Sequence, residues 1–319
     1  MHVHHGIEGL QELPRGVVLT IGNFDGIHRG HLAILDLANQ KRNSAGIAVA
    51  TFEPHPFTVL RPQLAPPRLT PLPIKQALLQ SLGVDHLVIL PPTPQVLNLT
   101  AEAFWQILKD QVRPAHLIEG ESFTFGKNRG GSIDRLKQWS QASNIQLHIA
   151  PPVQVPLLDL HVVEVSSSLI RWLLINGRAR DAAICLGRPY ALQGEVIKGF
   201  QRGQDLGFPT ANLNCTDQLI PAEGVYVARC QIGELNYPTA LSIGTLPTFK
   251  DGQFQVEAHL IGFTGDLYNQ IIQVELIDWI REQRKFPNIE TLKQNIESDI
   301  SQVRRRSTLP AADPIARLV

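Results

Sequence analysis

Residues 194–213 read GEVIKGFQRGQDLGFPTANL and form the most informative stretch of this chain. Its glycines recur every four residues, at Gly199, Gly203 and Gly207. Glycine tolerates positive φ and lets a backbone lie close to a bulky ligand. The run ends in a Pro-Thr-Ala-Asn turn, where Thr210 and Asn212 share one side if the segment is extended. Their neutral oxygens suit a hard cation such as Mg²⁺ on a nucleotide phosphate.

The glycine spacing does not match two familiar phosphate-binding motifs. The run lacks the GKS or GKT of a Walker P-loop, and its glycines do not fit the dinucleotide-binding fingerprint. Taken alone, the glycines fit equally well in a hairpin, where isolated glycines commonly mark β-bulges. The pattern therefore predicts either a ligand-binding loop or a glycine-rich hairpin.

The chain around this run, from about Gly187 onward, is rich in strands. Strand-like segments separated by turn residues occur at 191–199, 224–232, 237–244, 255–263 and 271–280. Such a series without long intervening helices predicts an antiparallel sandwich or barrel. An amphipathic pattern at about 289–304 predicts a closing helix. The change of pattern near Leu186 to Pro189 predicts two domains, 1–186 and 187–319.

The first half alternates strands with helices. Apolar runs predict strands at 16–22, 47–52, 86–90, 116–120 and 145–150, and helical spacing predicts helices at 31–42, 73–83, 101–112 and 132–143. This alternation predicts an α/β domain with a parallel, Rossmann-type sheet covered by helices on both faces. Residues 58–73 are rich in proline and predict an extended loop. Residues 166–178 predict a helix with a serine cap.

Composition limits the classes of function. The net charge is zero, which argues against a general nucleic-acid binder. Cys185, Cys215 and Cys230 show no metal or redox spacing, so we expect reduced thiols in a cytoplasmic protein. The N-terminal segment MHVHHGIEGLQELP lacks the apolar core of a signal peptide, and no apolar run is long enough to span a membrane. His2, His4 and His5 could bind a metal, but the pattern favours a first strand.

Several short motifs occur in order along the chain. They are TIGNFDGIHRGH (20–31), TFEPHP (51–56), FTFG (123–126), SSSLIR (166–171), LGRPY (186–190), the run at 194–213, IGTLPTF (243–249), VEAHL (256–260) and REQRKF (281–286). On these motifs, nearly the whole chain resembles the bacterial bifunctional riboflavin kinase/FAD synthetase family. The resemblance implies a nucleotidyltransferase-like α/β domain at 1–186 and a small closed β-barrel with a C-terminal helix at 187–319.

The resemblance assigns FMN adenylylation to the first domain, with His28 and His31 as its catalytic pair. Both would lie on one face at the start of a helix, which receives phosphate well. There they could donate hydrogen bonds to oxygens that gain charge as pyrophosphate departs. A pair of capping or core histidines is the alternative. The implied ATP contacts are Gly22, Asn23, Phe24, Asp25, Gly30, Ser167, Ser168 and Arg171.

The resemblance also implies the residues that border the flavin. They are Pro54, His55, Pro56 and Phe57 in the first domain, and Arg281 and Phe286 after the last strand. The loop 123–131, with Lys127 and Arg129, is similar to a flavin- or nucleotide-facing part of the first site. The alternative for Arg281 and Phe286 is a charged segment that leads into a helix. The alternative for Phe57 is an aromatic side chain in the hydrophobic core.

The second domain, by resemblance, phosphorylates riboflavin. Glu257 is implied as the base, with Thr210 and Asn212 as Mg²⁺ ligands and the glycines 199, 203 and 207 close to ATP. Phosphoryl transfer needs such a metal and a base near the hydroxyl. Strand alternation puts Glu257 and His259 on one face, opposite Val256, Ala258 and Leu260. An exposed strand glutamate is the alternative.

The expected protein is thus an enzyme with two active sites. It uses Mg²⁺, takes ATP as co-substrate with riboflavin and FMN, and releases FMN and FAD as products. It binds neither nucleic acid nor membrane and is a monomer or weak homo-oligomer. The chain departs from the family pattern at Gln204, Ser242 and Leu246, which leaves a protein that only adenylylates FMN as one alternative. A flavin-storage protein without turnover is the other.

Overall fold

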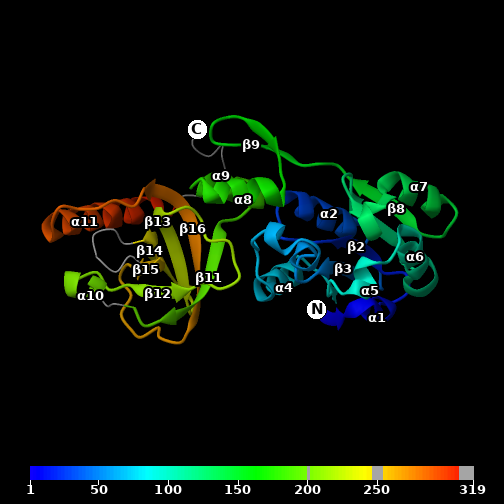
Figure 1. Ribbon diagram of the computed structural model, residues 1–319, viewed down its shortest axis with the longest axis horizontal. Helices are drawn as coiled ribbons and strands as arrows, with labels where there is room; N and C mark the ends of the chain where they lie inside the picture. The colour runs from blue at the N-terminus through cyan, green and yellow to red at the C-terminus, as the bar shows by residue number, and fades with distance from the viewer. Residues whose placement is uncertain (200–201, 246–253, 309–319) are drawn as a thin grey trace. The chain divides into compact units, whose positions relative to one another are not determined.

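The computed structural model describes residues 1–199, 202–245 and 254–308 (Figure 1). The chain divides into two compact units, Met1–Gln154 and Val155–Val319. We call them unit 1 and unit 2 and describe each by itself.

Unit 1 is built on a six-stranded sheet with the strand order β1-β4-β3-β2-β5-β8. All neighbouring strands run parallel. The strands are β1 (His2–His5), β2 (Val18–Gly22), β3 (Ile47–Phe52), β4 (His86–Leu90), β5 (His116–Gly120) and β8 (Gln146–Ala150). The predicted parallel, Rossmann-type sheet is therefore confirmed.

The central strands are apolar on both faces because helices cover both faces. Along β2, Val18 and Leu19 enter different core clusters, as side chains of a strand alternate between faces. One cluster includes residues of α1 (Gly6–Gln11), α6 (Ala101–Gln106) and α7 (Ile133–Gln141). The other includes residues of α2 (Arg29–Gln40) and α4 (Leu72–Ser81). The predicted two-sided cover of the sheet is confirmed.

Two local predictions in unit 1 need correction. The segment 101–112 is an α-helix only as far as Gln106 and continues as a π-helix, η2 (Ile107–Val112). The proline-rich segment 58–73 is not one extended loop, since it contains most of α3 (Phe57–Leu60), the 3₁₀ turn η1 (Pro62–Leu64) and the start of α4. Proline at the first turn of a helix loses no hydrogen bond, so these prolines start helices as well as end them.

Histidines from adjacent strands form two close pairs in this sheet. Nε2 of His4 lies 3.2 Å from Nδ1 of His86, and Nδ1 of His116 lies 3.0 Å from Nε2 of His148. Burial, and then nearby positive charge, lowers the pKa of His86, His116 and His148 below the ordinary value of 6.5. No group of three potential ligands among the described residues could hold a metal ion, so His2, His4 and His5 form strand β1 rather than a metal site.

We expect these pairs to make unit 1 less stable in weak acid. A histidine whose pKa is lowered by folding stabilises the protein fully above pH 6.5. That contribution is lost as the pH falls below 6.5 toward the lowered value, because the unfolded chain then binds more protons. Melting temperatures of wild type and of His116→Gln/His148→Gln, measured from pH 7.5 to 5.5, test this. The double variant should lose less stability over that range; parallel curves would contradict the prediction.

Unit 2 contains a closed barrel with the strand order β11-β12-β15-β14-β13-β16. All neighbouring strands are antiparallel. The strands are β11 (Tyr190–Ile197), β12 (Ala211–Asn214), β13 (Gly224–Ile232), β14 (Leu235–Thr245), β15 (Phe254–Leu260) and β16 (Ile271–Arg281). The predicted antiparallel barrel is confirmed, although the sequence did not predict β12 as a strand.

Helices precede and follow the barrel strands in the sequence. The predicted helices appear as α8 (Ser167–Ile175) and α11 (Ile289–Arg306), the second of which buries Val303 against the barrel. Between α8 and β11 lies α9 (Ala179–Leu186), which packs on β11 and β16. Unit 2 therefore begins earlier than the predicted domain boundary near Leu186, and that boundary stays a prediction.

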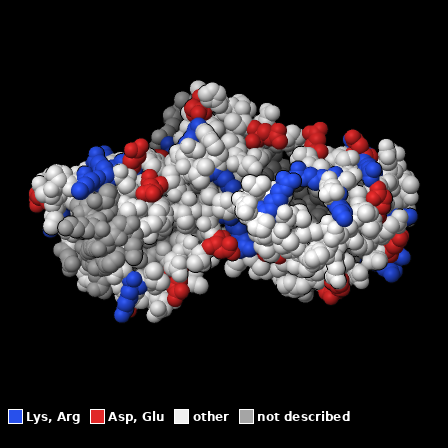
Figure 2. All heavy atoms as spheres, in the orientation of Figure 1, with Lys and Arg blue, Asp and Glu red and all other residues white. Residues whose placement is uncertain are grey.

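The surface carries both signs of charge. Figure 2 shows Lys and Arg side chains interspersed with Asp and Glu side chains over both units. Among the helices that the structure describes, none combines the length and apolar character needed to span a membrane.

Candidate active sites

Four polar side chains share one face where β12 meets β15. Asn212 pairs directly with Glu257, and Ala211 pairs with Ala258. One step further along this antiparallel register sets Thr210 opposite His259. Because strand side chains alternate between faces, all four point the same way. The pairing of β12 with β15 thus brings Asn212 next to Glu257, although 45 residues separate them in the sequence.

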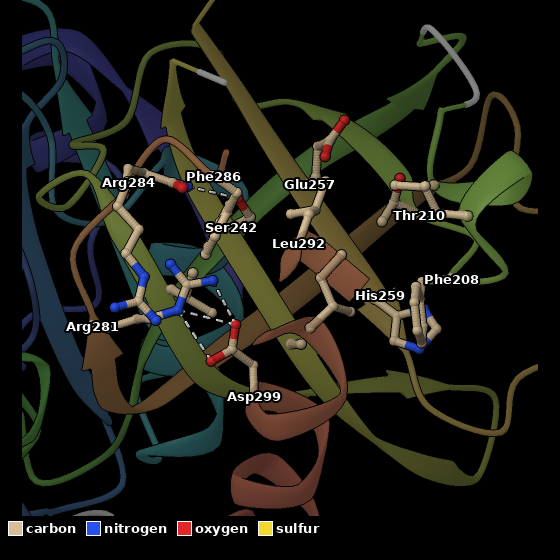
Figure 3. Close-up of a pocket in the computed structure, with 16 residues that line it drawn as sticks. Phe208, Thr210, Ser242, Glu257, His259, Arg281, Arg284, Phe286, Leu292 and Asp299 are labelled. Carbon is tan, nitrogen blue, oxygen red and sulfur yellow. Dashed lines mark hydrogen bonds and ion pairs between the residues drawn. The ribbon is translucent and has the colours of Figure 1, made fainter. Parts of the chain in front are cut away.

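This face borders a cavity of about 140 Å³ (Figure 3). Glu257 and His259 of β15 line it, as do Ser242 of β14 and Thr210, the residue just before β12. Apolar lining comes from the barrel, from α10 (Arg202–Leu206), from α11 and from the segments beside these helices: Leu206, Phe208, Val225, Ala240, Phe286, Leu292 and Ile296. Gly203, Arg281, Gln283, Arg284 and Asp299 complete the lining. The cavity therefore offers an apolar wall to a flat ring and a polar wall for chemistry.

Arg281 and Phe286, the two residues expected to border the flavin here, line the same cavity. The Arg281 guanidinium donates to both carboxylate oxygens of Asp299 on α11, with Nη2 at 2.7 Å from Oδ2. It also lies 5.4 Å from the centre of the Phe286 ring. This ion pair fastens α11 to the end of β16, so that the helix closes one side of the cavity. No sequence motif predicted this contact of Asp299.

The glycines of the 194–213 run serve the turn itself. A Cβ on Gly199 would lie 2.1 Å from Nδ2 of Asn212, and one on Gly203 would lie 2.4 Å from the Phe208 carbonyl. Gly207 has φ +89°, which favours glycine. The run does connect two antiparallel neighbours, β11 and β12, but none of the three glycines lies in a strand, so the bulge part of the alternative is wrong. Their close packing holds Asn212 and Thr210 in place.

A second cavity, of about 350 Å³, adjoins the first. Thr210 lines both cavities and therefore stands on the border between them. The second cavity has mixed walls, formed by Val196, Gln204, Pro209, Thr210, Ala211, Ala258, Leu260, Phe263, Gly265, Asp266, Leu267 and Tyr268. Of the three departures from the family pattern, Gln204 lines this cavity, Ser242 accepts a hydrogen bond from Gln283, and Leu246 lies outside the described residues.

In unit 1 the two predicted histidines meet at the start of α2. The rings of His28 and His31 stack with their centres 3.8 Å apart, and Phe24 lies against His31 at 4.8 Å. Phe24 has φ 45°, a left-handed conformation that is costly for a bulky residue and that recurs at functional sites. The spacing of three residues thus brought the pair together on one face, as predicted.

A network of buried polar groups holds the turn before α2 through hydrogen bonds. The Asp25 carboxylate accepts the backbone N–H groups of Leu69 and Thr70. The carbonyl of Asn23 accepts hydrogen bonds from Thr51 Oγ1 at 2.9 Å and from Lys75 Nζ at 3.1 Å. Asp25 therefore holds the backbone just before α4 by hydrogen bonds. Its expected contact with ATP stays a prediction.

Lys75 is the centre of this network. Its side chain is 4% exposed and lies 3.0 Å from Glu53, which also pairs with Arg68 at 2.8 Å. Deeper in the sheet, Glu119 accepts the N–H of Ile21, and burial raises its pKa well above the ordinary value. Sequence patterns missed these residues, because their partners are distant in the chain.

We expect Lys75→Met to destabilise unit 1 by about 3–5 kcal/mol, since removing one partner of a buried ion pair leaves the other charge uncompensated. Urea unfolding followed by circular dichroism measures the change. Lys137→Met is the matched control, because Lys137 is 56% exposed and its ion pair lies at the surface. Equal unfolding midpoints for the two variants would contradict a structural role for Lys75.

The remaining predicted contacts fall in both units. Pro54, His55, Pro56 and Phe57 follow β3, whose end neighbours the end of β2 because Gly22 pairs with Thr51. Ser167, Ser168 and Arg171 lie in α8 of unit 2, and the Ser166 hydroxyl caps that helix by accepting from Leu169 N, as predicted. The role of these residues in binding ATP or flavin stays a prediction.

Comparison with known proteins covers both units. The family model for FAD synthetase matches residues 10–168, and the model for riboflavin kinase matches residues 186–307. Bifunctional riboflavin kinase/FMN adenylyltransferases from Pseudomonas fluorescens and Escherichia coli K12 are each 34% identical to this chain. The first match covers 95% of this chain and 97% of the relative, and the second covers 94% and 96%.

Among solved structures, one described as a macrolide-efflux protein from Streptococcus pneumoniae is similar, with a TM-score of 0.83 and 27% identity. That match covers 95% of this chain and 99% of the other. The two family models match consecutive parts of the chain, and the relatives match over almost their full length. On this similarity, the chain belongs to the bifunctional riboflavin kinase/FMN adenylyltransferase family.

Proposed function

We propose that this chain makes both flavin cofactors in sequence. The barrel converts riboflavin and ATP to FMN and ADP, and unit 1 supplies the catalytic histidines that convert FMN and ATP to FAD and pyrophosphate. The observation that carries the proposal is the pairing of Asn212 with Glu257, which lines, together with Thr210, a cavity that also has an apolar wall. A flavin ring fits such an apolar wall, while its hydroxyl tail needs the polar one.

In the kinase step, the hydroxyl oxygen of riboflavin attacks the γ-phosphorus of ATP, and Glu257 accepts the proton of that hydroxyl. A carboxylate on a polar cavity wall suits this role. The bond from the γ-phosphorus to the bridging oxygen breaks, and ADP leaves. The larger cavity on the other side of Thr210 is our candidate for the nucleotide, because both substrates would then meet at Thr210.

Thr210 and Asn212 are a suitable donor set for Mg²⁺. Both offer neutral oxygens, both project to one face, and Mg²⁺ commonly keeps water and phosphate oxygens as its other ligands. When bound, the ion would neutralise phosphate charge during transfer. The packing of Gly199 against Asn212 supports this assignment, because it fixes the direction of the amide.

In the adenylyl step, an FMN phosphate oxygen attacks the α-phosphorus of ATP, and pyrophosphate leaves. His28 and His31 donate hydrogen bonds to the phosphate oxygens that gain charge, at a helix start that itself attracts anions. The stacked rings beside Phe24 support this role, since stacking keeps both donors at one place. We further propose that Ser167, Ser168 and Arg171 bind ATP and that Pro54 to Phe57 border the FMN.

We also propose a cytoplasmic enzyme that is a monomer or weak homo-oligomer. Cys185, Cys215 and Cys230 form no disulfide within the described structure, which supports a reducing compartment.

One incubation tests the proposed function. The protein is mixed with riboflavin, ATP and Mg²⁺, and the flavins are separated by chromatography over time. We expect FMN to appear first and FAD to follow. If the protein forms FAD from supplied FMN but no FMN from riboflavin, the barrel only binds flavin and the kinase activity is refuted. If it converts neither flavin, both activities are refuted.

A further inference from the structure

Among the four polar residues described at the meeting of β12 and β15, His259 is the one that the proposed chemistry leaves without a role. It lies on β15, two residues after Glu257, and lines the same cavity. Its Nδ1 lies 2.7 Å from the carbonyl oxygen of Pro209. A carbonyl oxygen only accepts hydrogen bonds, so Nδ1 carries the proton and donates it. The ring also meets Phe208 edge-on, with centres 6.0 Å apart.

Pro209 is the residue at which the turn needs such an anchor. The ladder between β12 and β15 starts at Ala211, so Thr210 lies just outside it. Pro209 has no N–H to contribute to a ladder. On the other side, Phe208 N donates to the carbonyl of Gly203 in α10. The bond from His259 therefore ties the turn to β15 between these two points, one residue before Thr210.

We propose that His259 is a positioning residue for phosphoryl transfer. By holding the Pro209 carbonyl, it sets the distance between the oxygens of Thr210 and the carboxylate of Glu257, and so the metal geometry of the site. This inference rests on the proposed kinase function of the barrel. Displacements of even about 1 Å at such a site can cost about a hundredfold in rate.

The chemistry of the bond distinguishes positioning from proton transfer. A histidine that donates from Nδ1 to a carbonyl oxygen does so without passing its proton on. The hydrogen bond to Pro209 therefore involves no proton transfer, and a positioning role adds no ionisation of its own to the pH dependence of FMN formation. A role as general base would add one.

Two substitutions separate the hydrogen bond from the ring. His259→Phe keeps a ring beside Phe208 and loses the donor, whereas His259→Asn can place an amide nitrogen where Nδ1 lies. The measurements are the Mg²⁺ concentration for half-maximal FMN formation, its pH profile, and hydrogen exchange at the amides of Thr210 to Asn212. FAD formation from supplied FMN serves as the control for folding.

We expect His259→Phe to raise the half-maximal Mg²⁺ concentration by about five- to tenfold, the upper end for the loss of one hydrogen bond, and to speed exchange at the turn. His259→Asn should stay within about twofold of wild type, because the donor is kept. Both variants should form FAD from FMN at the wild-type rate and keep the wild-type pH profile.

Three results would overturn the inference. They are a wild-type Mg²⁺ dependence and exchange rate in His259→Phe, equal impairment of the two variants, or loss of an ionisation from the pH profile of His259→Asn. Failure of the proposed function has a different signature. If wild type forms no FMN, the kinase assignment is wrong, while the exchange rates still decide whether His259 holds the turn.

Discussion

Glu257→Gln should abolish FMN formation from riboflavin and leave FAD formation from supplied FMN unchanged. The substitution keeps the size of the side chain and removes the group that accepts the hydroxyl proton. Loss of a positioned general base lowers the rate by about 10²- to 10⁴-fold. Since Glu257 pairs with Asn212 in the ladder, the backbone register should survive the change. Chromatography of the flavins after separate incubations with riboflavin and with FMN measures both rates.

The matched control is Glu234→Gln, which alters an exposed glutamate in the tight turn between β13 and β14. It should leave both rates unchanged. A second pair addresses the metal: Thr210→Ala should stop FMN formation, whereas Thr210→Ser keeps the hydroxyl and should retain it. Equal loss of both activities in a folded Glu257→Gln protein would refute two separate sites.

The second large effect is expected for the double variant His28→Ala/His31→Ala. FAD formation should fall by about 10³-fold or more, because each lost donor to developing charge costs about 10²- to 10³-fold. FMN formation from riboflavin should remain. Release of pyrophosphate from FMN and ATP measures the first activity directly. The single variants should not add up to the double one, since the two stacked rings act at one place.

Folding should tolerate this double change. His28 is the N-cap residue of α2, yet within the described structure its side chain accepts no capping hydrogen bond, which also argues against a capping role for it. His5→Ala on β1 is the control, since His5 is exposed in the same unit. A double variant with wild-type pyrophosphate release would exclude the histidines from the chemistry.

The regular elements followed from sequence periodicity, and the exceptions have physical causes. Continuous apolar runs predicted the parallel sheet, and alternating apolar and polar residues predicted the barrel. Both patterns lie within single strands, because they record which faces of a strand are buried. Strand β12 was missed since Pro-Thr-Ala-Asn has the composition of a turn, and pairing with β11 and β15 makes its last residues part of a strand. The π-helical end of the helix after Ala101 was missed for a related reason, as helical spacing does not distinguish the two kinds of turn.

The sites were predictable where spacing within one segment was enough. His28 with His31, and Thr210 with Asn212, are close in the chain and so share a face. Contacts that depend on distant partners were not predictable, such as Lys75 with Glu53 or Arg281 with Asp299. The meeting of Asn212 and Glu257 was implied only by resemblance, since their register is a property of the closed barrel.

The closing helix α11 has a consequence for biosynthesis on the ribosome. It supplies Leu292, Ile296 and Asp299 to the cavity beside Glu257, although it follows every strand of the barrel in the chain. Domains fold as their segments emerge during translation, so the parallel sheet of unit 1 can assemble while the barrel is still incomplete. A nascent chain therefore acquires its first enzymatic step last, and premature termination before α11 leaves a polypeptide that depends on FMN made by finished copies.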